Sequence, residues 1–445
     1  MSNPFVFDGV ALPGDRTAWL AGGLDPDGVV RSFSMEQTGS LIVNGMTTTE
    51  SLTTSGGLIT PATRALNVDG DGLPVDSGYG IWPAATNLVT NGGFETNTTG
   101  WTAVLSGETV TRDTTVFKFG TASGRVSTPG STSFEGMQYA TTTTAAATYT
   151  GSCWVRAPEG ATMRIRLRQT SAPATVIATT EFVGTGDWQH VSVTGAAIDT
   201  STNVQVITNL SAQEITYYID GVQVESGSIA TPYIETDGST ESRTAGRVQM
   251  PVADLFTETQ GWIAMRMLMP YASTDGASGT GRYFAWETTD NFIRAFRSAG
   301  ATPLAVQRQA AGVGNPVTKT GAWTAGDAIS AVATWTAAGA GASLDGSTFS
   351  TVAQTAIPDL SGLSTVDFGR QSGGSNVIDA NYLWVATGSG TLTDADAAAL
   401  NALGATPPTW AQLVSSVAIC AMPTALWRAE DDTFIKASYA PDGGS

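Results

Sequence analysis

Histidine is nearly absent from this sequence, in which His190 is the single histidine among 445 residues. Zinc sites usually take two or more histidine or cysteine ligands, so histidine-based metal catalysis is excluded by number. A Ser-His-acid triad would have to use His190, yet no Gly-x-Ser-x-Gly segment presents a nucleophile. His190 lies near Trp188 in a strand-like run, and we expect it on the surface of a strand.

Cysteine is also scarce, since Cys153 and Cys420 are the only two and lie far apart. The clustered cysteines that hold small secreted domains together are missing, which disfavours a disulfide between them. Cys153 belongs to the strand-like run SCWVRA, where a buried free thiol is the usual state. We therefore expect Cys153 to be buried and unpaired.

Charged residues are few, and positive ones are fewest. Aspartate and glutamate number 39 against 21 lysines and arginines, so the net charge is −18. A nucleic-acid binder needs a basic footprint, which no Lys/Arg cluster supplies, and anionic membranes are disfavoured for the same reason. No apolar run approaches the ~20 residues that span a bilayer, and the start MSNPFVFDG lacks the charged and apolar regions of a signal peptide. The composition fits neutral glycans, or protein neighbours in an assembly.

Small and strand-forming residues are abundant instead. The apolar share of 41% is enough for real cores, and the length predicts two or three domains. Between residues 86 and 236, short strand-like runs and turn signals recur at the spacing of an all-β sandwich. The predicted strands are 101–105, 116–119, 137–144, 148–156, 162–169, 176–183, 188–194, 203–209 and 215–225.

The most informative stretch of this region is 214–237. It alternates apolar and polar side chains, breaks at Asp220-Gly221 and ends its second run at Pro232. Together with NLVTNGGFETNTTGW at 87–101, it resembles the closing and opening strands of a jelly-roll carbohydrate-binding module. The phrase IDGVQVE…ATPYIETDG is similar to what such modules carry in bacteriophage tail and virion proteins.

That resemblance implies a structural calcium ion between the first and last strands, with Glu95 and Asp220 as ligands. Backbone carbonyls would complete the shell of about six to eight oxygens. The alternative is that Glu95 is a solvated turn residue. If glycan is bound, exposed aromatic rings should stack on sugar faces. Our candidates are Trp101, Tyr139 and Tyr271, which lie near presumed loop or strand ends.

A polar linker at 237–246 precedes a second all-β unit at 247–404. The run GDAISAVATWTAAGAGASLDGSTF, followed by LWVATGSGTLTDADAAALNALG, resembles a laminin-G or concanavalin-A-like sandwich. In that family a last strand leads into a short helix.

Two short helices are predicted near the C-terminus. Thr393 as cap, acidic residues in the first turn and an apolar stripe predict a helix over 393–403. Within the C-terminal piece 405–445, apolar residues at helical spacing predict another over 409–420.

Residues 1–85 do not have the pattern of a compact domain. Short apolar pieces such as Leu41-Ile42-Val43 are separated by polar residues, and their strand edges could pair with another chain. Such a segment is either a flexible tail or a docking arm that is ordered by neighbouring subunits, and we favour the arm. Within it, NVDGDGLPVDSG at 67–78 matches the first positions of a calcium loop, but Gly78 replaces the required bidentate glutamate. An Asp-Gly turn is therefore favoured there.

Glycoside hydrolysis is the enzymatic alternative, because it needs only two carboxylates. A concanavalin-A-like hydrolase would show Glu-x-Asp-x-Glu on one strand face, and no such triplet occurs. Glu287 and Asp290 are three residues apart, which suits a strand end and its turn.

Together these patterns predict an all-β protein with two β-sandwich (jelly-roll) domains, 86–236 and 247–404, after an extended arm. The predicted function is a non-enzymatic bacteriophage virion structural protein of the tail or head, located on the particle surface, that displays glycan-binding sandwiches for host adhesion. Expected partners are other virion proteins through the arm, further copies of the chain and host-surface glycans. Nucleic acid and membrane insertion are not expected. The alternatives are a secreted carbohydrate-binding protein or a glycan depolymerase.

Overall fold

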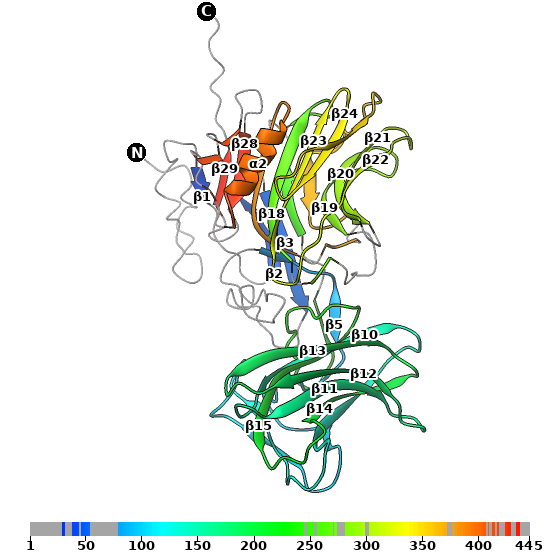
Figure 1. Ribbon diagram of the computed structural model, residues 1–445, viewed down its shortest axis with the longest axis vertical. Helices are drawn as coiled ribbons and strands as arrows, with labels where there is room; N and C mark the ends of the chain where they lie inside the picture. The colour runs from blue at the N-terminus through cyan, green and yellow to red at the C-terminus, as the bar shows by residue number, and fades with distance from the viewer. Residues whose placement is uncertain are drawn as a thin grey trace, which may run out of the picture.

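Antiparallel strands dominate the structure, a computed structural model, which confirms the predicted all-β class (Figure 1). Among the residues described, every strand pairing is antiparallel and the well-formed helix is a single short one near the C-terminus. The described residues are 29–31, 38–43, 46–53, 79–243, 247–252, 256–269, 271–273, 281–298, 302–371, 376–378, 380–405, 408, 412–413, 416–417, 423–428 and 433–436.

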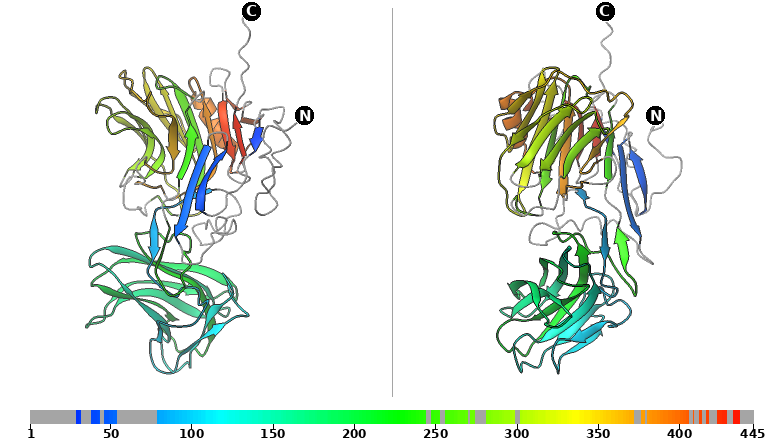
Figure 2. Two further views of the ribbon diagram at one scale, coloured as in Figure 1. Left: turned by 180° about the vertical axis from the view of Figure 1, so that it is seen from behind. Right: turned by 90° about the vertical axis from the view of Figure 1, so that its right-hand side faces the viewer.

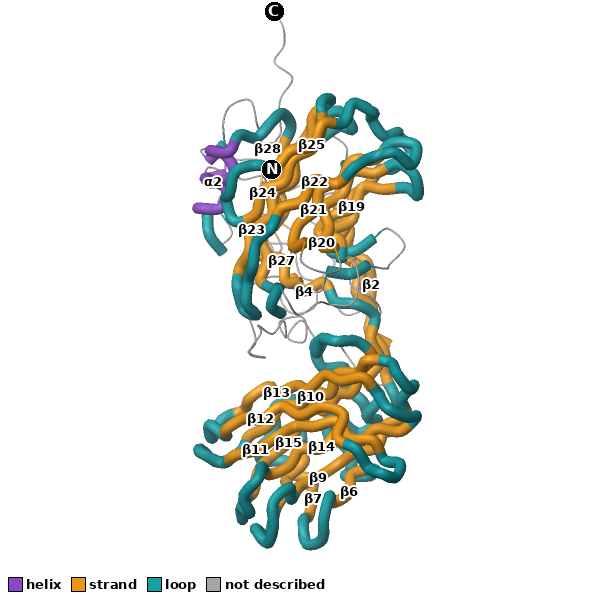
Figure 3. Tube along the Cα trace, turned by 45° about the vertical axis from the view of Figure 1, so that its right-hand side comes forward, coloured by secondary structure: helices purple, strands orange, loops and turns teal. Residues whose placement is uncertain are grey.

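The first sandwich consists of two five-stranded sheets (Figure 3). One sheet has the order β13 (Trp188–Ala196), β10 (Thr148–Arg156), β15 (Thr216–Ser226), β8 (Ser123–Ser127) and β7 (Thr109–Asp113). The other has the order β12 (Val176–Val183), β11 (Thr162–Gln169), β14 (Ser201–Thr208), β9 (Gly136–Thr142) and β6 (Trp101–Ala103).

The core of this sandwich is formed by the inward residues of both sheets. Ile165, Leu167, Val204 and Val206 from one sheet are fully or almost fully buried, and Ile219 lies opposite them on the other. Because successive strand residues point to opposite faces, their neighbours in sequence face outward. Cys153 lies in this core as a free thiol, which confirms the prediction. Burial raises its pKa far above the usual range.

One predicted strand of this region, 116–119, is wrong. The backbone N–H groups of Lys118 and Phe119 instead donate to the carboxylate of Asp220, at 2.7 and 2.9 Å. A strand ladder cannot use N–H groups that already bind a side chain, so the chain turns there and β8 begins at Ser123. The alternating pattern of a short apolar run did not reveal this local side-chain hydrogen bonding.

The second sandwich has larger sheets, which also recruit strands from both ends of the chain. The nine-stranded sheet contains β1 (Val29–Arg31), β29 (Thr433–Lys436), β28 (Pro423–Arg428), β27 (Ala380–Gly388), β18 (Gly261–Leu268), β23 (Ala328–Thr336), β24 (Gly339–Leu344), β25 (Ser350–Ala353) and, beside β27, β4 (Tyr79–Ile81).

The ten-stranded sheet contains β22 (Pro316–Lys319), β21 (Thr302–Gln309), β20 (Phe292–Ser298), β19 (Arg282–Glu287), β26 (Thr365–Phe368), β17 (Arg247–Pro251), β3 (Met46–Thr53), β16 (Glu241–Arg243), β5 (Ala85–Asn87) and, beside β3, β2 (Thr38–Val43). Apolar residues such as Met265, Ile293 and Tyr382 fill the space between the sheets. A laminin-G or concanavalin-A-like identity for this unit stays a prediction.

The helix α2 (Asp394–Ala402) confirms the helix that was predicted over 393–403. Thr393 caps it in a capping box with Asp396. Leu400 packs with Trp262 and Trp384 on the outer face of the nine-stranded sheet. Of the predicted helix 409–420, most residues lie outside the described part of the chain. Where the chain is described, no helix is long and apolar enough to cross a membrane.

The described N-terminal strands pair within the chain, and the docking of residues 1–85 to neighbouring subunits stays a prediction. The strand β2, which includes Leu41-Ile42-Val43, forms a hairpin with β3, and β3 pairs with β17 and β16. The strand β4 pairs with β27 and β1 pairs with β29. Their backbone groups are thus satisfied by the second sandwich. The predicted calcium loop at 67–78 lies outside the described residues.

The two sandwiches are joined by a short two-stranded ribbon (Figure 2). The strand β5 leads into the first sandwich and pairs with β16, which leads out of it through the predicted linker 237–246. Asn87 is fully buried and donates to the carbonyls of Val222 and Ile234, while Leu88 N–H donates to the carbonyl of Val224. The end of the ribbon is thereby fixed to β15.

Candidate functional site

A row of arginines lies on the outer face of the sheet β12-β11-β14-β9-β6. In β11, Met163, Ile165 and Leu167 point into the core, so the alternating residues Arg164, Arg166 and Arg168 point outward. By strand register, Gln205 of β14 lies beside Arg166 and Gln138 of β9 lies beside Gln205. We call the outward-pointing set Arg164, Arg166, Arg168, Gln205 and Gln138 the arginine face; Arg166 is 8% exposed and Gln205 is fully buried, whereas the other three are partly exposed.

Hydrogen bonds between neighbouring strands order the middle of the arginine face. The Nε of Arg166 donates to Oε1 of Gln205, and Gln205 Nε2 donates to Oε1 of Gln138. Asn203 also donates to Gln138 Oε1, at 3.0 Å. The guanidinium plane of Arg166 is therefore fixed, and its two terminal nitrogens have no hydrogen-bond partner among the described residues. A planar fork held in this way is ready to donate two parallel bonds.

A loop between β8 and β9 places an aromatic ring over two of the arginines. The guanidinium carbons of Arg164 and Arg166 lie 4.8 and 5.4 Å from the ring centroid of Phe134. Phe134 has a φ of 70°, an uncommon backbone conformation for a bulky residue. The surrounding hydrogen bonds must therefore hold it in place.

The carboxylate of Glu135 supplies those hydrogen bonds. It accepts from the backbone N–H groups of Gly130 and Ser131 at 2.7 Å each and of Thr132 at 2.9 Å. Glu135 is only 1% exposed, so water competes little for these contacts. The loop is closed around its own glutamate, and Phe134 is presented in a fixed position.

Positive charge on the arginine face is mostly uncompensated. Arg164 forms an ion pair with Glu181 at 2.8 Å, but no carboxylate within the described part of the chain pairs with Arg166 or Arg168. Burial, and then the charges of Arg168 and Arg164, lower the pKa of Arg166 to about 10. The three guanidinium groups thus repel one another in a partly desolvated place, which an anion would relieve.

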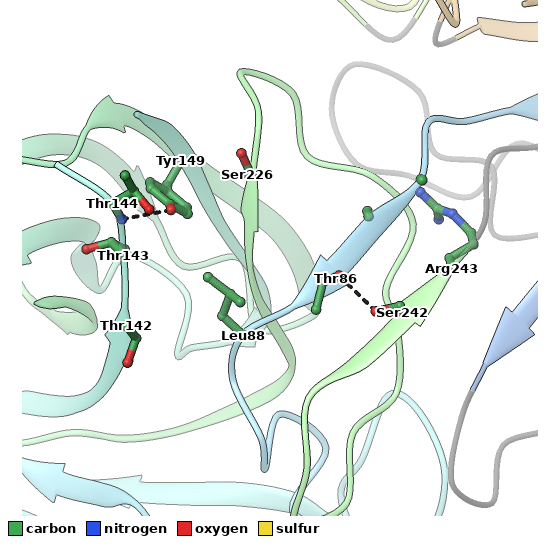
Figure 4. Close-up of a pocket in the computed structure, with 11 residues that line it drawn as sticks. Thr86, Leu88, Thr142, Thr143, Thr144, Tyr149, Ser226, Ser242 and Arg243 are labelled. Carbon is green, nitrogen blue, oxygen red and sulfur yellow. Dashed lines mark hydrogen bonds between the residues drawn. The ribbon is translucent and has the colours of Figure 1, made fainter. Parts of the chain in front are cut away.

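A pocket of about 650 Å³ lies where the ribbon meets the first sandwich (Figure 4). Hydroxyl groups surround it, but many already have partners. Thr86 and Ser242 share a hydrogen bond of 2.8 Å, and Tyr149 accepts one from the backbone of Thr144. Arg243 donates to two backbone carbonyls. Because its lining comes from both the ribbon and the first sandwich, we take this pocket as part of the junction.

Comparison with known families identifies the part of the chain that carries the arginine face. Residues 86–214 match the family described as "Carbohydrate binding domain" (CBM_4_9). The matched residues make up most of the first sandwich, which is therefore similar to a carbohydrate-binding module domain. Apart from β5, the match includes no strand of the second sandwich, and no curated protein matches the chain.

Solved structures similar to the chain include several modules of this kind. A structure titled "CBM4 structure and function" has 18% identity, covers 31% of this chain and 99% of its own, and gives a TM-score of 0.26. A CBM22-1 xylan-binding domain from Paenibacillus barcinonensis has 15% identity, covers 34% and 97%, and gives 0.25. The tandem CBM22-1–CBM22-2 domain of the same organism has 12% identity, covers 70% and 96%, and gives 0.26. These likenesses are too weak to carry a functional argument.

The predicted calcium ligands lie near each other in the module but already have donors. Both oxygens of Glu95 accept from Thr121, and both oxygens of Asp220 accept from backbone N–H groups. Burial, opposed by those hydrogen bonds and aided slightly by the charge of Glu95, raises the pKa of Asp220 to about 7. Calcium needs about six to eight oxygen ligands. Among the described residues no group of three acidic, histidine or cysteine side chains could hold a metal, so a calcium ion here would need several backbone carbonyls, and the site stays a prediction.

The three predicted sugar-stacking rings are buried, which corrects the expectation that they are exposed. Trp101 and Tyr139 are 6% and 8% exposed and face each other across β6 and β9 inside the module. Their polar atoms bind Asn91 and Thr90. Tyr271 is 4% exposed in the second core and donates to the carbonyl of Ile378. Rings with both faces packed cannot stack on a sugar.

The acidic residues weighed for hydrolysis do not form a catalytic pair. Glu287 is 5% exposed and lies 3.7 Å from Arg282 and 3.5 Å from Arg294. It is therefore held in a buried ion cluster. Asp290 lies in the turn after β19, where its carbonyl accepts from Gly312.

The arginine face was not predicted from the sequence, because its arginines are not consecutive and form no obvious Lys/Arg cluster. The signal was present in TMRIRLRQ at 162–169, where arginines alternate with apolar residues. In a strand with one buried face, that alternation places all three arginines on the outer face. Phe134 could not be found in the same way, because the conformation of its loop depends on Glu135.

Proposed function

We propose that this chain is a non-enzymatic glycan-binding protein that binds carbohydrate across the arginine face of its first sandwich. The observation that carries the proposal is the ordered row of amide and guanidinium groups beside the fixed ring of Phe134. Sugars present hydroxyls that need hydrogen-bond partners and C–H faces that pack on aromatic rings. The match of residues 86–214 to a carbohydrate-binding family supports the same conclusion.

The experiment is a glycan array probed with the full-length chain, followed by titration of any positive glycan. The variant F134A should weaken binding by about tenfold or more, since it removes the stacking ring while leaving the sheet intact. F117A is the matched control, because Phe117 is an exposed phenylalanine of the same sandwich away from this sheet. The absence of binding to every glycan, or equal losses in both variants, would refute the proposal.

A finer proposal is that the protein displays this module on a bacteriophage particle to adhere to host-surface glycans. The sequence resemblance of the stretch 219–238 to virion proteins is its support. Mass spectrometry of purified particles tests it. A protein that is absent from intact particles but present in the surrounding lysate would leave the alternative of a free carbohydrate-binding protein.

A further inference from the structure

We propose that the glycan bound by the arginine face is acidic, with a carboxylate on its sugars, rather than neutral. This inference rests on the proposed function, because it names the chemical class of ligand for the same surface. It is based on the three arginines that share one face of β11. Within the described residues, the only carboxylate that pairs with one of these arginines is that of Glu181, which pairs with Arg164.

The donor chemistry of this face selects for an anion. A guanidinium group only donates hydrogen bonds, so it offers nothing to the donor half of a neutral sugar hydroxyl. Its planar fork matches a carboxylate, to which it can donate two parallel bonds. A neutral glycan would cover Arg166 and Arg168 without supplying a counter-charge, and desolvating an unpaired charge is costly.

The arrangement also fits a chain of charges rather than a single one. Alternate residues of a strand are about 6.6–6.8 Å apart, so the Cα atoms of the three arginines lie along a line of about 13 Å. The row runs from Arg164, beside Phe134, to Arg168 near the other end of β11. A polymer that carries a carboxylate on successive sugars can meet more than one arginine, with a sugar ring near Phe134.

The rest of the protein argues against general attraction to polyanions. The chain has a net charge of −18, so long-range forces repel a nucleic acid or another polyanion. Attraction is confined to the short range of the arginine face. Recognition should therefore depend on the position of carboxylates along a sugar chain and not on charge alone.

Affinity electrophoresis and calorimetry with the full-length chain test this inference. The probes are polygalacturonate, which has a carboxylate on each sugar, and its methyl ester, which is the same polymer without the charge. Neutral xylan, dextran sulfate and duplex DNA complete the set. We expect binding to polygalacturonate that weakens by about tenfold or more on esterification and weakens as salt is raised.

Two matched variants locate the interaction. Arg168 is half-buried and has no ion-pair partner among the described residues, so R168Q should leave the fold intact. It should weaken polygalacturonate binding by about tenfold, with little change for the methyl ester. R125Q makes the same charge change at an exposed position of β8, in the opposite sheet, and should bind like the wild type. Circular dichroism checks that both variants are folded.

The outcomes separate this inference from the proposed function. If the ester or xylan binds as well as polygalacturonate, the face binds glycan but the preference for acid is refuted. If dextran sulfate or DNA binds equally well, charge alone is recognised and the inference is also refuted. If no glycan in either this set or the array binds, the proposed function itself fails.

Discussion

The loop that carries Phe134 should depend on one buried carboxylate. In the wild type, Glu135 accepts three backbone hydrogen bonds, and each charge-assisted bond stabilises by about 1.5 kcal/mol at the low end. The variant E135Q keeps one acceptor oxygen, which can hold two neutral bonds of about 1 kcal/mol each. Its amide group turns a donor toward the N–H of Gly130, which is then left unpaired. We therefore expect the loop to lose about 3 kcal/mol of stability.

Hydrogen exchange followed by mass spectrometry measures this loss where it occurs. A difference of about 3 kcal/mol corresponds to exchange on the order of 100-fold faster for the amides of 130–132, if the loop opens locally. E159Q is the control, because Glu159 is exposed in a turn of the same sandwich. Glycan binding should weaken with E135Q although every arginine is retained. Exchange within about threefold of the wild type would refute the reasoning, because it would show that these hydrogen bonds do not hold the loop.

Three further predictions concern the stability of the chain. Burial raises the folded-state pKa of Asp220 to about 7, so between about pH 4 and 7 the folded protein holds a proton that the unfolded carboxylate has released. The free energy of unfolding should thus fall by about 4 kcal/mol as pH rises through that window and then level off. Thermal melts of the wild type and D220N at pH 5 and 8 check this, because the variant should not show the difference in stability between the two pH values. Stabilisation of the wild type by calcium at pH 8 would instead support the predicted metal site. Deleting residues 1–84 removes β3 and β4, which pair with β17, β16 and β27, so calorimetry should show a lower melting temperature for the second sandwich. An unchanged melting temperature would mean that these pairings contribute nothing to its stability. T393A removes the cap of α2 and should cost about 1 kcal/mol in urea unfolding, with T391A as the comparison.

Sequence patterns predicted what depends on local periodicity. The alternation in 162–169 and 203–209 matches β11 and β14 almost to the residue, and Thr393 with its following acidic residues predicted α2. Both signals are contained in a few consecutive residues. They reflect which side chains can be buried and which backbone groups need a cap.

Which face of a strand is buried could not be predicted in the same way. Trp101 opens β6, a strand of three residues that is too short to show an alternation, so its inward direction depends on the pairing with Tyr139 of β9. The pairing of β3 with β17 joins residues about 200 positions apart, which no local pattern reports. The N–H groups that the carboxylate of Asp220 accepts from lie about a hundred residues earlier in the chain, which no local pattern reports either.

The ribbon of β5 and β16 has a mechanical consequence. Each strand runs from one sandwich to the other, in opposite directions, and the two are hydrogen-bonded to each other. Tension that pulls the sandwiches apart is therefore shared by two segments of the same chain. Bending has to distort the hydrogen bonds between β5 and β16, whereas a single linker would bend freely. If the first sandwich is bound to a surface, the second sandwich can adopt only a narrow range of orientations relative to that surface. Such stiffness lowers the entropy that is lost when several copies bind one surface together.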